Sequence, residues 1–256
     1  MGTDSLVPSV CIDAVLEGRS LEDAVSIVSQ TGFSAFEFWS WWDKDLDELV
    51  AERDKNELAV AAFCTKFISL VDPSQRKDYL KGLTESIAAA ETLECTTLIS
   101  QVGDTESDKS PEEQRQSLID GLIAAAPLVE AAEITLVIEP RNQKVDHPGY
   151  FLVHSEEAFD IVEAVGSPNV KVLFDIYHQQ VSEGNLIKNI VDNIDKIGHF
   201  HAAGNPGRNE LSGGEINYPE VFSAIQSSGY SGYVGLEYWP KRDPAAGLFE
   251  VVSLFE

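Results

Sequence analysis

The feature that most constrains the fold is a regular alternation of short apolar runs with segments of helical spacing along the whole chain. Continuous runs of roughly four to eight β-branched and aliphatic residues are typical of strands that are buried on both faces, as in parallel sheets. Parallel strands are usually connected by a helix. We predict strands at residues 7–12, 35–39, 58–63, 96–100, 134–139, 170–174, 196–200 and 232–236.

Helical stretches lie between the predicted strands and carry recognisable start signals. Ser20 with Asp23 resembles a capping box with a shortened acidic side chain. Ser110 supplies an N-cap in front of Pro111, and proline is favoured at the first helical position. We expect helices at residues 20–30, 45–56, 73–93, 110–132, 155–165, 184–192, 218–227 and 245–255.

Eight strand-plus-helix units follow one another without a linker or a low-complexity segment between them. This order predicts an α/β protein, and eight units in about 250 residues match a closed (β/α)8 TIM barrel. We therefore expect a single TIM-barrel domain over residues 1–256. A doubly wound open sheet is the alternative, but the first strand-to-helix turn lacks the glycine-rich phosphate fingerprint of that fold.

Composition and charge exclude several classes of protein. With 43 acidic against 18 basic residues, the formal net charge of −25 disfavours general binding to nucleic acid, because phosphate backbones would be repelled. No apolar run approaches the roughly 20 residues that span a bilayer, and residues 1–8 lack the features of a signal peptide. We expect a cytoplasmic protein with no membrane partner. The three cysteines form no CxxC motif, so we expect reduced core residues.

Four polar side chains close consecutive predicted strands in the C-terminal half: Glu139, Asp175, His201 and Glu237. The C-terminal ends of barrel strands face one mouth, where active sites collect. Three carboxylates and an imidazole in that mouth would repel one another unless a cation neutralised them. Oxygen-rich ligation with one nitrogen suits Mn²⁺, Mg²⁺, Co²⁺ or Zn²⁺. The sequence therefore predicts a divalent metal site, with capping or salt-bridge roles as the alternative, and no organic cofactor is expected.

Residues that flank these strand ends are candidates for substrate binding. His178 follows Asp175 by three residues, and we place it in the loop above that strand, where it can bind a substrate oxygen or a proton. The planar guanidinium of Arg208 suits a carboxylate, with a surface salt bridge as the alternative. His199 shares a strand face with His201 and is expected to pack or hydrogen-bond beneath it. His147 and His154 are interpreted as structural.

Three tryptophans, Trp39, Trp41 and Trp42, follow the second predicted strand and should lie near the same mouth. Aromatic side chains there can keep water away from a reactive intermediate. Core packing and an interface, for example of a homo-oligomer, explain the cluster equally well. We assign these residues no catalytic role.

Motifs in the C-terminal half resemble the hydroxypyruvate isomerase family, one of the xylose isomerase-like barrels that also include ketose 3-epimerases. The N-terminal half is similar to that family mainly in its barrel pattern. The matching motifs keep the order and spacing of the family and are Ile138-Glu-Pro140 with Pro148-Gly-Tyr-Phe-Leu152, Phe174-Asp-Ile-Tyr-His-Gln179, Gly198-His-Phe-His201 with Pro206-Gly-Arg208, Gly214-Glu-Ile-Asn-Tyr-Pro219, and Gly235-Leu-Glu-Tyr238.

The resemblance implies roles for individual residues. Glu139, Asp175, His201 and Glu237 match divalent-metal ligands, and Glu139 and Glu237 also match a pair of proton-transferring carboxylates. His178 matches a substrate-contacting position, as does Arg208. One departure concerns the ligand on the seventh strand, because many hydroxypyruvate isomerases have glutamine where this chain has His201, and histidine there is more like the ketose epimerases. A second is Ala203-Gly204, which replaces the Ala-Asp often found before the Pro-Gly-Arg turn.

The expected activity is a metal-dependent isomerisation of a small hydroxy-aldehyde and hydroxy-ketone through an enediolate. Hydroxypyruvate and tartronate semialdehyde are the leading pair of small-molecule substrates. A ketose 3-epimerase or a related keto-acid sugar isomerase is the first alternative. An abasic-site endonuclease should have more metal-binding histidines than the five present and a basic groove. A binding module without catalytic activity is the last alternative.

Overall fold

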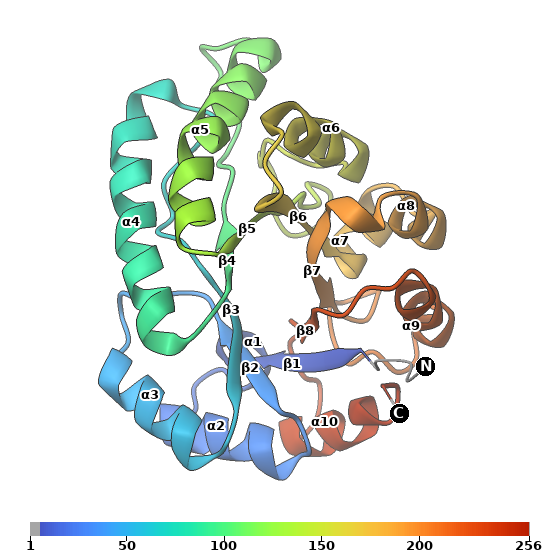
Figure 1. The fold of residues 1–256 in the computed structure, drawn as a ribbon. Coiled ribbons are helices and arrows are strands. Elements are labelled where there is room, and N and C mark those ends of the chain that lie inside the picture. The colour runs from blue at the N-terminus through green and yellow to red at the C-terminus, as the bar shows by residue number, and fades with distance from the viewer. Residues whose placement is uncertain (1–5, 256) are drawn as a thin grey trace.

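The computed structural model describes residues 6–255, and within them eight parallel strands close into a barrel surrounded by helices (Figure 1). Neighbouring strands pair in chain order, and β8 closes the barrel on β1 with Val10 opposite Leu236. The predicted (β/α)8 fold is confirmed. The strands are β1 Val7–Cys11, β2 Ala35–Phe38, β3 Ala59–Cys64, β4 Thr97–Ser100, β5 Thr135–Ile138, β6 Val170–Asp175, β7 Ile197–Ala202 and β8 Tyr233–Leu236.

Helices cover the outside of the barrel between successive strands (Figure 1). Every predicted helix is present, with ends shifted by a few residues. The helices are α1 Ile12–Val15, α2 Leu21–Gln30, α3 Leu46–Lys55, η1 Pro73–Gln75, α4 Arg76–Leu93, α5 Pro111–Ala131, α6 Ser155–Val165, α7 Ile176–Ser182, α8 Leu186–Asp192, η2 Ile194–Lys196, α9 Tyr218–Ser227 and α10 Pro244–Val252. Between residues 6 and 255, no helix has both the length and the apolar character that crossing a membrane requires.

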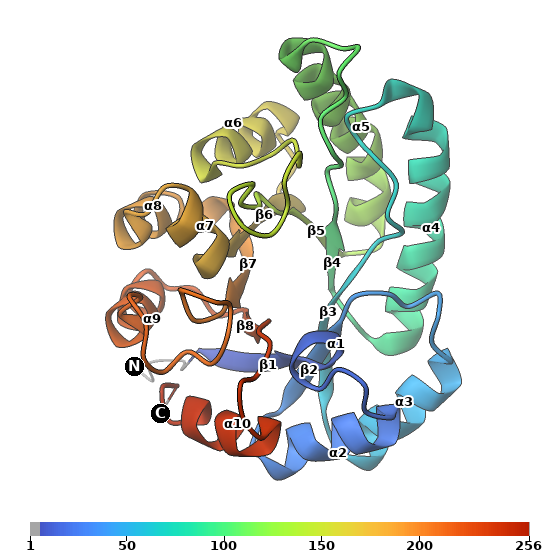
Figure 2. The same cartoon turned by 180° about the vertical axis from the view of Figure 1, so that it is seen from behind.

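Two helices that the sequence did not predict, α1 and α7, start directly at the ends of β1 and β6. Each is at most two turns long and follows its strand without a loop, so neither has the separate start signal of a longer helix. The strand residue itself caps α7, because Asp175 Oδ1 accepts a hydrogen bond of 2.9 Å from the backbone N–H of His178. Seen from the opposite side, α1 and the segment between β5 and α6 lie in front of the strands (Figure 2).

The predicted helix starts at Ser20 and Ser110 are confirmed. Ser20 Oγ accepts a hydrogen bond from the backbone N–H of Asp23 at 3.2 Å. Ser110 forms a full capping box, in which its hydroxyl accepts from the N–H of Glu113 and its own N–H donates to the Glu113 carboxylate. These caps set where the outer helices begin and therefore which of their faces meets the barrel.

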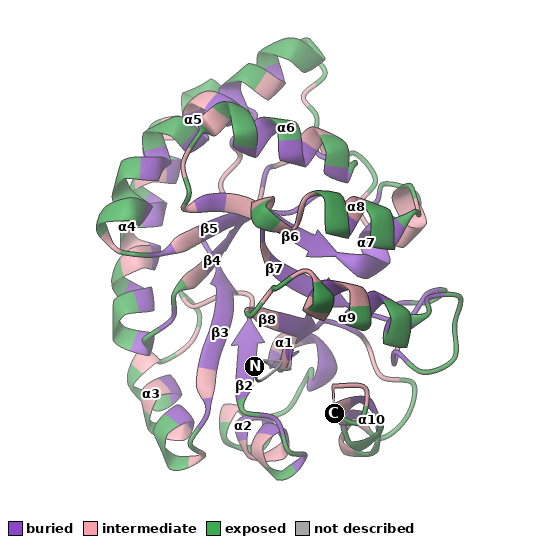
Figure 3. Cartoon of the chain, turned by 45° about the vertical axis from the view of Figure 1, so that its right-hand side comes forward, coloured by how far each residue is buried: buried purple, intermediate pink, exposed green. Residues whose placement is uncertain are grey.

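The core has an outer layer between strands and helices and a smaller cluster inside the barrel. The strands are buried, whereas the helices expose their outward faces (Figure 3). The cluster inside the barrel consists of Ala62, Cys64, Ile99, Val137 and Leu173. The interior on the side of β1, β2 and β7 is instead polar, with buried Ser9, Glu37, His199 and His201. All three cysteines are buried and unpaired, in agreement with the prediction that they are reduced.

Candidate active site

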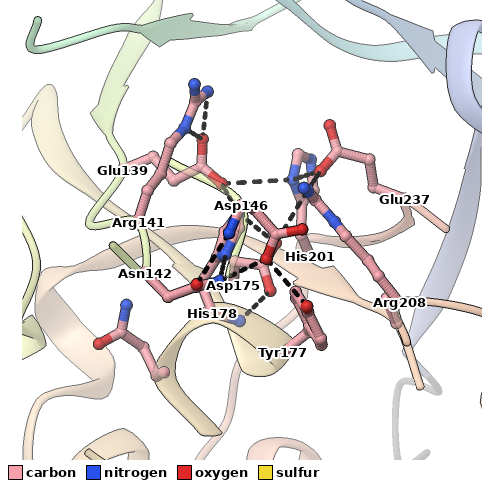
Figure 4. Close-up of polar contacts among 12 residues, drawn as sticks. Glu139, Arg141, Asn142, Asp146, Asp175, Tyr177, His178, His201, Arg208 and Glu237 are labelled. Carbon is pink, nitrogen blue, oxygen red and sulfur yellow. Dashed lines mark hydrogen bonds and ion pairs between the residues drawn. The ribbon is translucent and has the colours of Figure 1, made fainter. Parts of the chain in front are cut away.

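The four side chains predicted to bind a metal converge at the mouth of the barrel. Glu139 follows β5, Asp175 ends β6, His201 lies near the end of β7, and Glu237 follows β8. Each residue offers one ligand atom, and these atoms lie within 4.8 Å of one another. All four side chains are buried, and Figure 4 shows them together with their neighbours. Consecutive parallel strands thus bring together residues that are up to 98 positions apart in the chain.

The residues present fit a divalent cation. Within the described chain, Glu139 Oε1, Asp175 Oδ2 and His201 Nδ1 are buried without a hydrogen-bond partner. Unsatisfied buried polar atoms are costly, and charged ones most of all. His201 Nδ1 lies 3.6 Å from Glu237 Oε2 and 4.0 Å from Glu139 Oε1. Three carboxylate oxygens and one imidazole nitrogen are a donor set typical of Mn²⁺, Co²⁺ or Zn²⁺.

The charges in this site depend strongly on one another. Burial raises the pKa of Asp175, and the opposing effect of Arg208 offsets this only in part. Burial also favours the neutral form of Glu237, but Arg208 and His201 hold its pKa well below the usual value. Burial lowers the pKa of His201, but the carboxylates of Glu37 and Glu237 raise it above the normal value for histidine. The two cationic side chains therefore neutralise part of the carboxylate charge.

Arg208 lies inside the site, so the alternative of a surface salt bridge is wrong. Its guanidinium forms an ion pair with Glu237 and lies 3.8 Å from Asp175 Oδ2. The rings of Trp239 and Tyr177 lie 4.9 Å and 5.5 Å from its central carbon. The backbone of Arg208 has a φ of 54°, a left-handed conformation that most side chains avoid, and its carbonyl accepts from the N–H of Trp239. The turn thus holds the guanidinium beside the carboxylates of Glu237 and Asp175.

His178 presents an N–H donor to the site. It lies in the first turn of α7 rather than in the predicted loop. Asn142 Oδ1 accepts from the N–H groups of Val145 and Asp146, so Asn142 Nδ2 must be the atom that faces His178 Nδ1 at 2.6 Å. Because this ring nitrogen accepts, the proton is on Nε2, which lies 3.7 Å from Asp175 Oδ2. Burial and the charge of Arg208 lower the pKa of His178 and favour this neutral form.

A cavity of about 210 Å³ reaches Arg208 and Glu237 of this site. Trp39 lies on its wall and donates a hydrogen bond of 2.7 Å from Nε1 to Glu237 Oε1. Trp41 points elsewhere, with its Nε1 bonded to Ser86, and Trp42 is partly exposed against Phe67. The residues that line the cavity are Trp39, Cys64, Phe67, Gln101, Arg141, His147, Arg208, Glu237 and Trp239.

His147, interpreted from the sequence as structural, lies close to the site. His147 lines the cavity, and its ring lies edge-on to that of His178 with 5.1 Å between the centroids. His154 lies at the start of α6, where it is largely exposed and pairs with Glu183 at 3.4 Å. Only His154 therefore lies away from the site, as expected.

Two residues of the site were missed in the sequence. Arg141 donates from Nε to Glu139 Oε2 at 2.6 Å and lines the cavity. Its position two residues after Glu139 was the available signal. Glu37 is buried inside the barrel next to His199 and His201, which lower its pKa to about 2 although burial raises it. A single acid in the apolar run at residues 35–39 was the signal for Glu37.

A family model described as a xylose isomerase-like TIM barrel matches residues 25–254. The chain therefore belongs to the xylose isomerase-like TIM-barrel family. This match agrees with the closed eight-stranded barrel.

Relatives with known names place the chain among isomerases of this family. Hydroxypyruvate isomerase of Escherichia coli (strain K12) is 34% identical over 229 residues, which cover 86% of this chain and 88% of that enzyme. A 2-oxo-tetronate isomerase of Cupriavidus necator is 31% identical over 235 residues, or 88% of this chain and 90% of the relative. The crystal structure of an AP endonuclease, family 2, from Brucella melitensis superposes with a TM-score of 0.93 at 27% identity, covering 98% and 100% of the two chains.

Proposed function

We propose that this protein is a divalent-metal-dependent isomerase of small hydroxy-keto acids, with hydroxypyruvate and tartronate semialdehyde as its leading substrate pair. The observation that carries the proposal is the pairing of carboxylates with guanidinium groups at the mouth of the barrel, Glu139 with Arg141 and Glu237 with Arg208. Glu139 and Glu237 supply proton-transferring carboxylates at the buried ligand cluster. Arg141 and Arg208 place two guanidinium groups beside them on the cavity wall. The arginines favour an anionic substrate over a neutral sugar.

Glu139 is the better placed base of the two carboxylates. Its Oε1 has no hydrogen-bond partner between residues 6 and 255, whereas Oε1 of Glu237 accepts from Trp39 and Oε2 pairs with Arg208. We assign to Glu139 the removal of the proton from the carbon next to the substrate carbonyl. Glu237 takes up a proton from solvent and delivers it to the former carbonyl carbon, which becomes the new hydroxyl-bearing centre. Glu139 releases its proton to solvent, and the hydroxyl proton passes from one substrate oxygen to the other, so that both glutamates end as carboxylates. A divalent cation held by the four ligands would stabilise the negative charge that develops on the substrate oxygens.

The remaining polar groups bind and orient the substrate. His178 Nε2–H donates to a substrate oxygen, because its other ring nitrogen is occupied by Asn142. Arg208 binds the carboxylate through its planar guanidinium, whose Nε has no partner among residues 6–255. The cavity of about 210 Å³ is smaller than the roughly 300–1,000 Å³ of typical ligand pockets, which favours an acid of three or four carbons. Trp39 and Trp239 exclude water from the reacting atoms.

The test is an isomerase assay of the purified protein with hydroxypyruvate, a four-carbon 2-oxo acid and free ketoses, each with and without Mn²⁺. The proposal predicts turnover of the keto acids that depends on the metal. Turnover of free ketoses alone, or of no compound in the panel, contradicts the substrate class that we propose.

We expect Arg208→Lys to raise KM for hydroxypyruvate because lysine keeps the charge but loses the planar pair of donors. Hydrogen bonds to charged groups contribute about 1.5–3 kcal/mol, so kcat/KM should fall by about 10- to 100-fold. Steady-state kinetics at saturating Mn²⁺ measure this change. Arg242→Lys is the matched control, because Arg242 pairs with Glu250 at the surface. An unchanged KM for Arg208→Lys, or an equal loss in the control, would show that Arg208 does not bind the carboxylate.

One observation favours a second candidate function, epimerisation of a ketose at the third carbon. His201 supplies a ring nitrogen to the ligand cluster, as in the ketose epimerases that the sequence resembles. An epimerase would use the same two glutamates on opposite faces of one carbon. The products separate the two activities, since an isomerase moves the carbonyl group and an epimerase inverts a hydroxyl-bearing carbon.

A further inference from the structure

Glu37 is a buried carboxylate inside the barrel, directly beside a predicted metal ligand. It belongs to β2 and is 2% exposed. Its Oε2 accepts hydrogen bonds from Ser9 Oγ at 2.8 Å and from His199 Nε2 at 3.0 Å. Its Oε1 lies 2.8 Å from His201 Nε2. Glu37 lies on β2, and its carboxylate contacts side chains from two other strands, β1 and β7.

The barrel leaves space for this carboxylate at one residue of β8. Gly235 pairs with Ser9 on one side and with His201 on the other. A Cβ atom at position 235 would lie 2.3 Å from Glu37 Oε1, far inside contact distance. A glycine at this position is thus what allows Glu37 to reach His201 across the interior.

The contact with Glu37 distinguishes the two ring nitrogens of His201. Nε2 lies 2.8 Å from a carboxylate oxygen, at an angle outside that of a standard hydrogen bond. This close approach is attractive only when Nε2 carries the ring proton, so we take Nε2 as the N–H nitrogen. The other nitrogen, Nδ1, faces the ligand cluster, where Glu237 Oε2 lies 3.6 Å away. Metal-binding histidines commonly hold their second nitrogen against a carboxylate in this way, which fixes the tautomer and the orientation of the ring.

We propose that Glu37 is a positioning residue that orients Nδ1 of His201 toward the divalent cation, with Ser9 and His199 holding Glu37 in place. Nothing in the reaction requires Glu37 to touch substrate, and it acts through His201 alone. The inference rests on the metal site in the proposed function, but it concerns metal binding and not the identity of the substrate.

The test is Mn²⁺ binding to metal-free protein, measured by calorimetry for Glu37→Gln. Loss of a carboxylate that supports a metal-binding histidine weakens metal affinity by about 10- to 100-fold, and we expect a loss in that range. The matched control is Glu183→Gln, because Glu183 likewise accepts from a serine, Ser155, and lies 3.4 Å from a histidine, His154, outside the barrel. The control should bind Mn²⁺ like the wild type.

A double-mutant cycle shows whether Glu37 acts through His201. Glutamine at position 201 has no second ring nitrogen for Glu37 to hold. In the His201→Gln background, Glu37→Gln should therefore change the Kd for Mn²⁺ by no more than about twofold, whereas independent sites would show the same loss in both backgrounds. A tenfold loss in both backgrounds, or none in the wild-type background, would overturn the proposal.

Two further measurements cover the remaining outcomes. If Glu37→Gln does not fold, Ser9→Ala serves in its place, because it keeps the carboxylate and removes one of the groups that donate to it. Weaker Mn²⁺ binding is again expected, and unchanged binding contradicts the proposal.

The second measurement is ¹⁵N NMR of His201 in the Zn²⁺-loaded protein. It should show the proton on Nε2 and the metal on Nδ1, and the reverse assignment overturns the proposal. Both measurements can be made even if no isomerase activity is found. Failure of the proposed function can therefore be distinguished from failure of this inference.

Discussion

Replacing Glu139 by glutamine is expected to lower kcat for hydroxypyruvate isomerisation by about 10²- to 10⁴-fold, the usual contribution of a general acid or base. Glutamine is close in shape but cannot take a proton from carbon. Its amide can still face Arg141, which now donates to Glu139 Oε2. The loss should therefore fall on proton transfer and leave the folded structure in place. Steady-state kinetics with product detection by a coupled assay measure this change.

The kinetics of Glu139→Gln must be separated from weaker metal binding, since Glu139 belongs to the ligand cluster. Assays at increasing Mn²⁺ concentration do so, because a defect in affinity is overcome at saturation and a defect in proton transfer is not. Glu130→Gln is the matched control on the exposed face of α5. If Glu139→Gln keeps the activity of the wild type at saturating Mn²⁺, the catalytic role of Glu139 is wrong.

Removal of divalent metal is expected to abolish isomerase activity and to lower thermal stability. The carboxylates of Glu139, Asp175 and Glu237 then face one another, and only part of their charge is neutralised by Arg141, His201 and Arg208. A ligand that binds only the folded state at 100 times its Kd stabilises that state by about 2.7 kcal/mol. Thermal unfolding with a chelator, and again after addition of Mn²⁺, should show the corresponding rise in Tm together with the return of activity.

Asp175→Asn and Asp195→Asn separate specific binding from a general effect of the cation. Asp175 belongs to the ligand cluster, whereas Asp195 lies in η2 at the opposite end of β7. The rise in Tm with Mn²⁺ should be much smaller in Asp175→Asn and unchanged in Asp195→Asn. Full activity after exhaustive chelation would contradict metal dependence.

The barrel and the clustering of the four side chains at its mouth could be predicted because both depend on patterns within single strands. Each of the last four apolar runs ends in a side chain that can bind a metal, and parallel strands in chain order must place those ends together. Glu139 shows this well, because Pro140 follows the run at once and the strand ends at Ile138. Placing the ends of consecutive parallel strands together requires only their order in the chain, and the register between strands across the barrel need not be known.

Glu37 was not predicted, because its surroundings depend on contacts across the barrel. The contacts with Ser9, His199 and His201 arise from strands that are far apart in sequence and meet only when β8 closes on β1. The sequence shows only one acid among the apolar residues of its strand. Arg141 poses a similar problem, since a guanidinium two residues past a strand end can point to solvent as easily as into a cavity.

The short helix α7 was not predicted from the sequence, and His178 was therefore placed in a loop. The α7 helix starts at the last residue of β6, so a strand residue, Asp175, serves as its cap. A turn that begins without a loop has no separate signal in the sequence. The predicted loop was therefore wrong, although the predicted position of His178 above the end of its strand agrees with the distance of 3.7 Å from His178 Nε2 to Asp175 Oδ2.

The most direct test of the central claim is NMR of hydroxypyruvate incubated in heavy water with the Mn²⁺-reconstituted protein, after the metal has been removed from the products. The account predicts tartronate semialdehyde that carries deuterium on its hydroxyl-bearing carbon, formed faster than in controls without metal or with Glu139→Gln. Recovery of hydroxypyruvate with no more conversion and no more deuterium than those controls would contradict it.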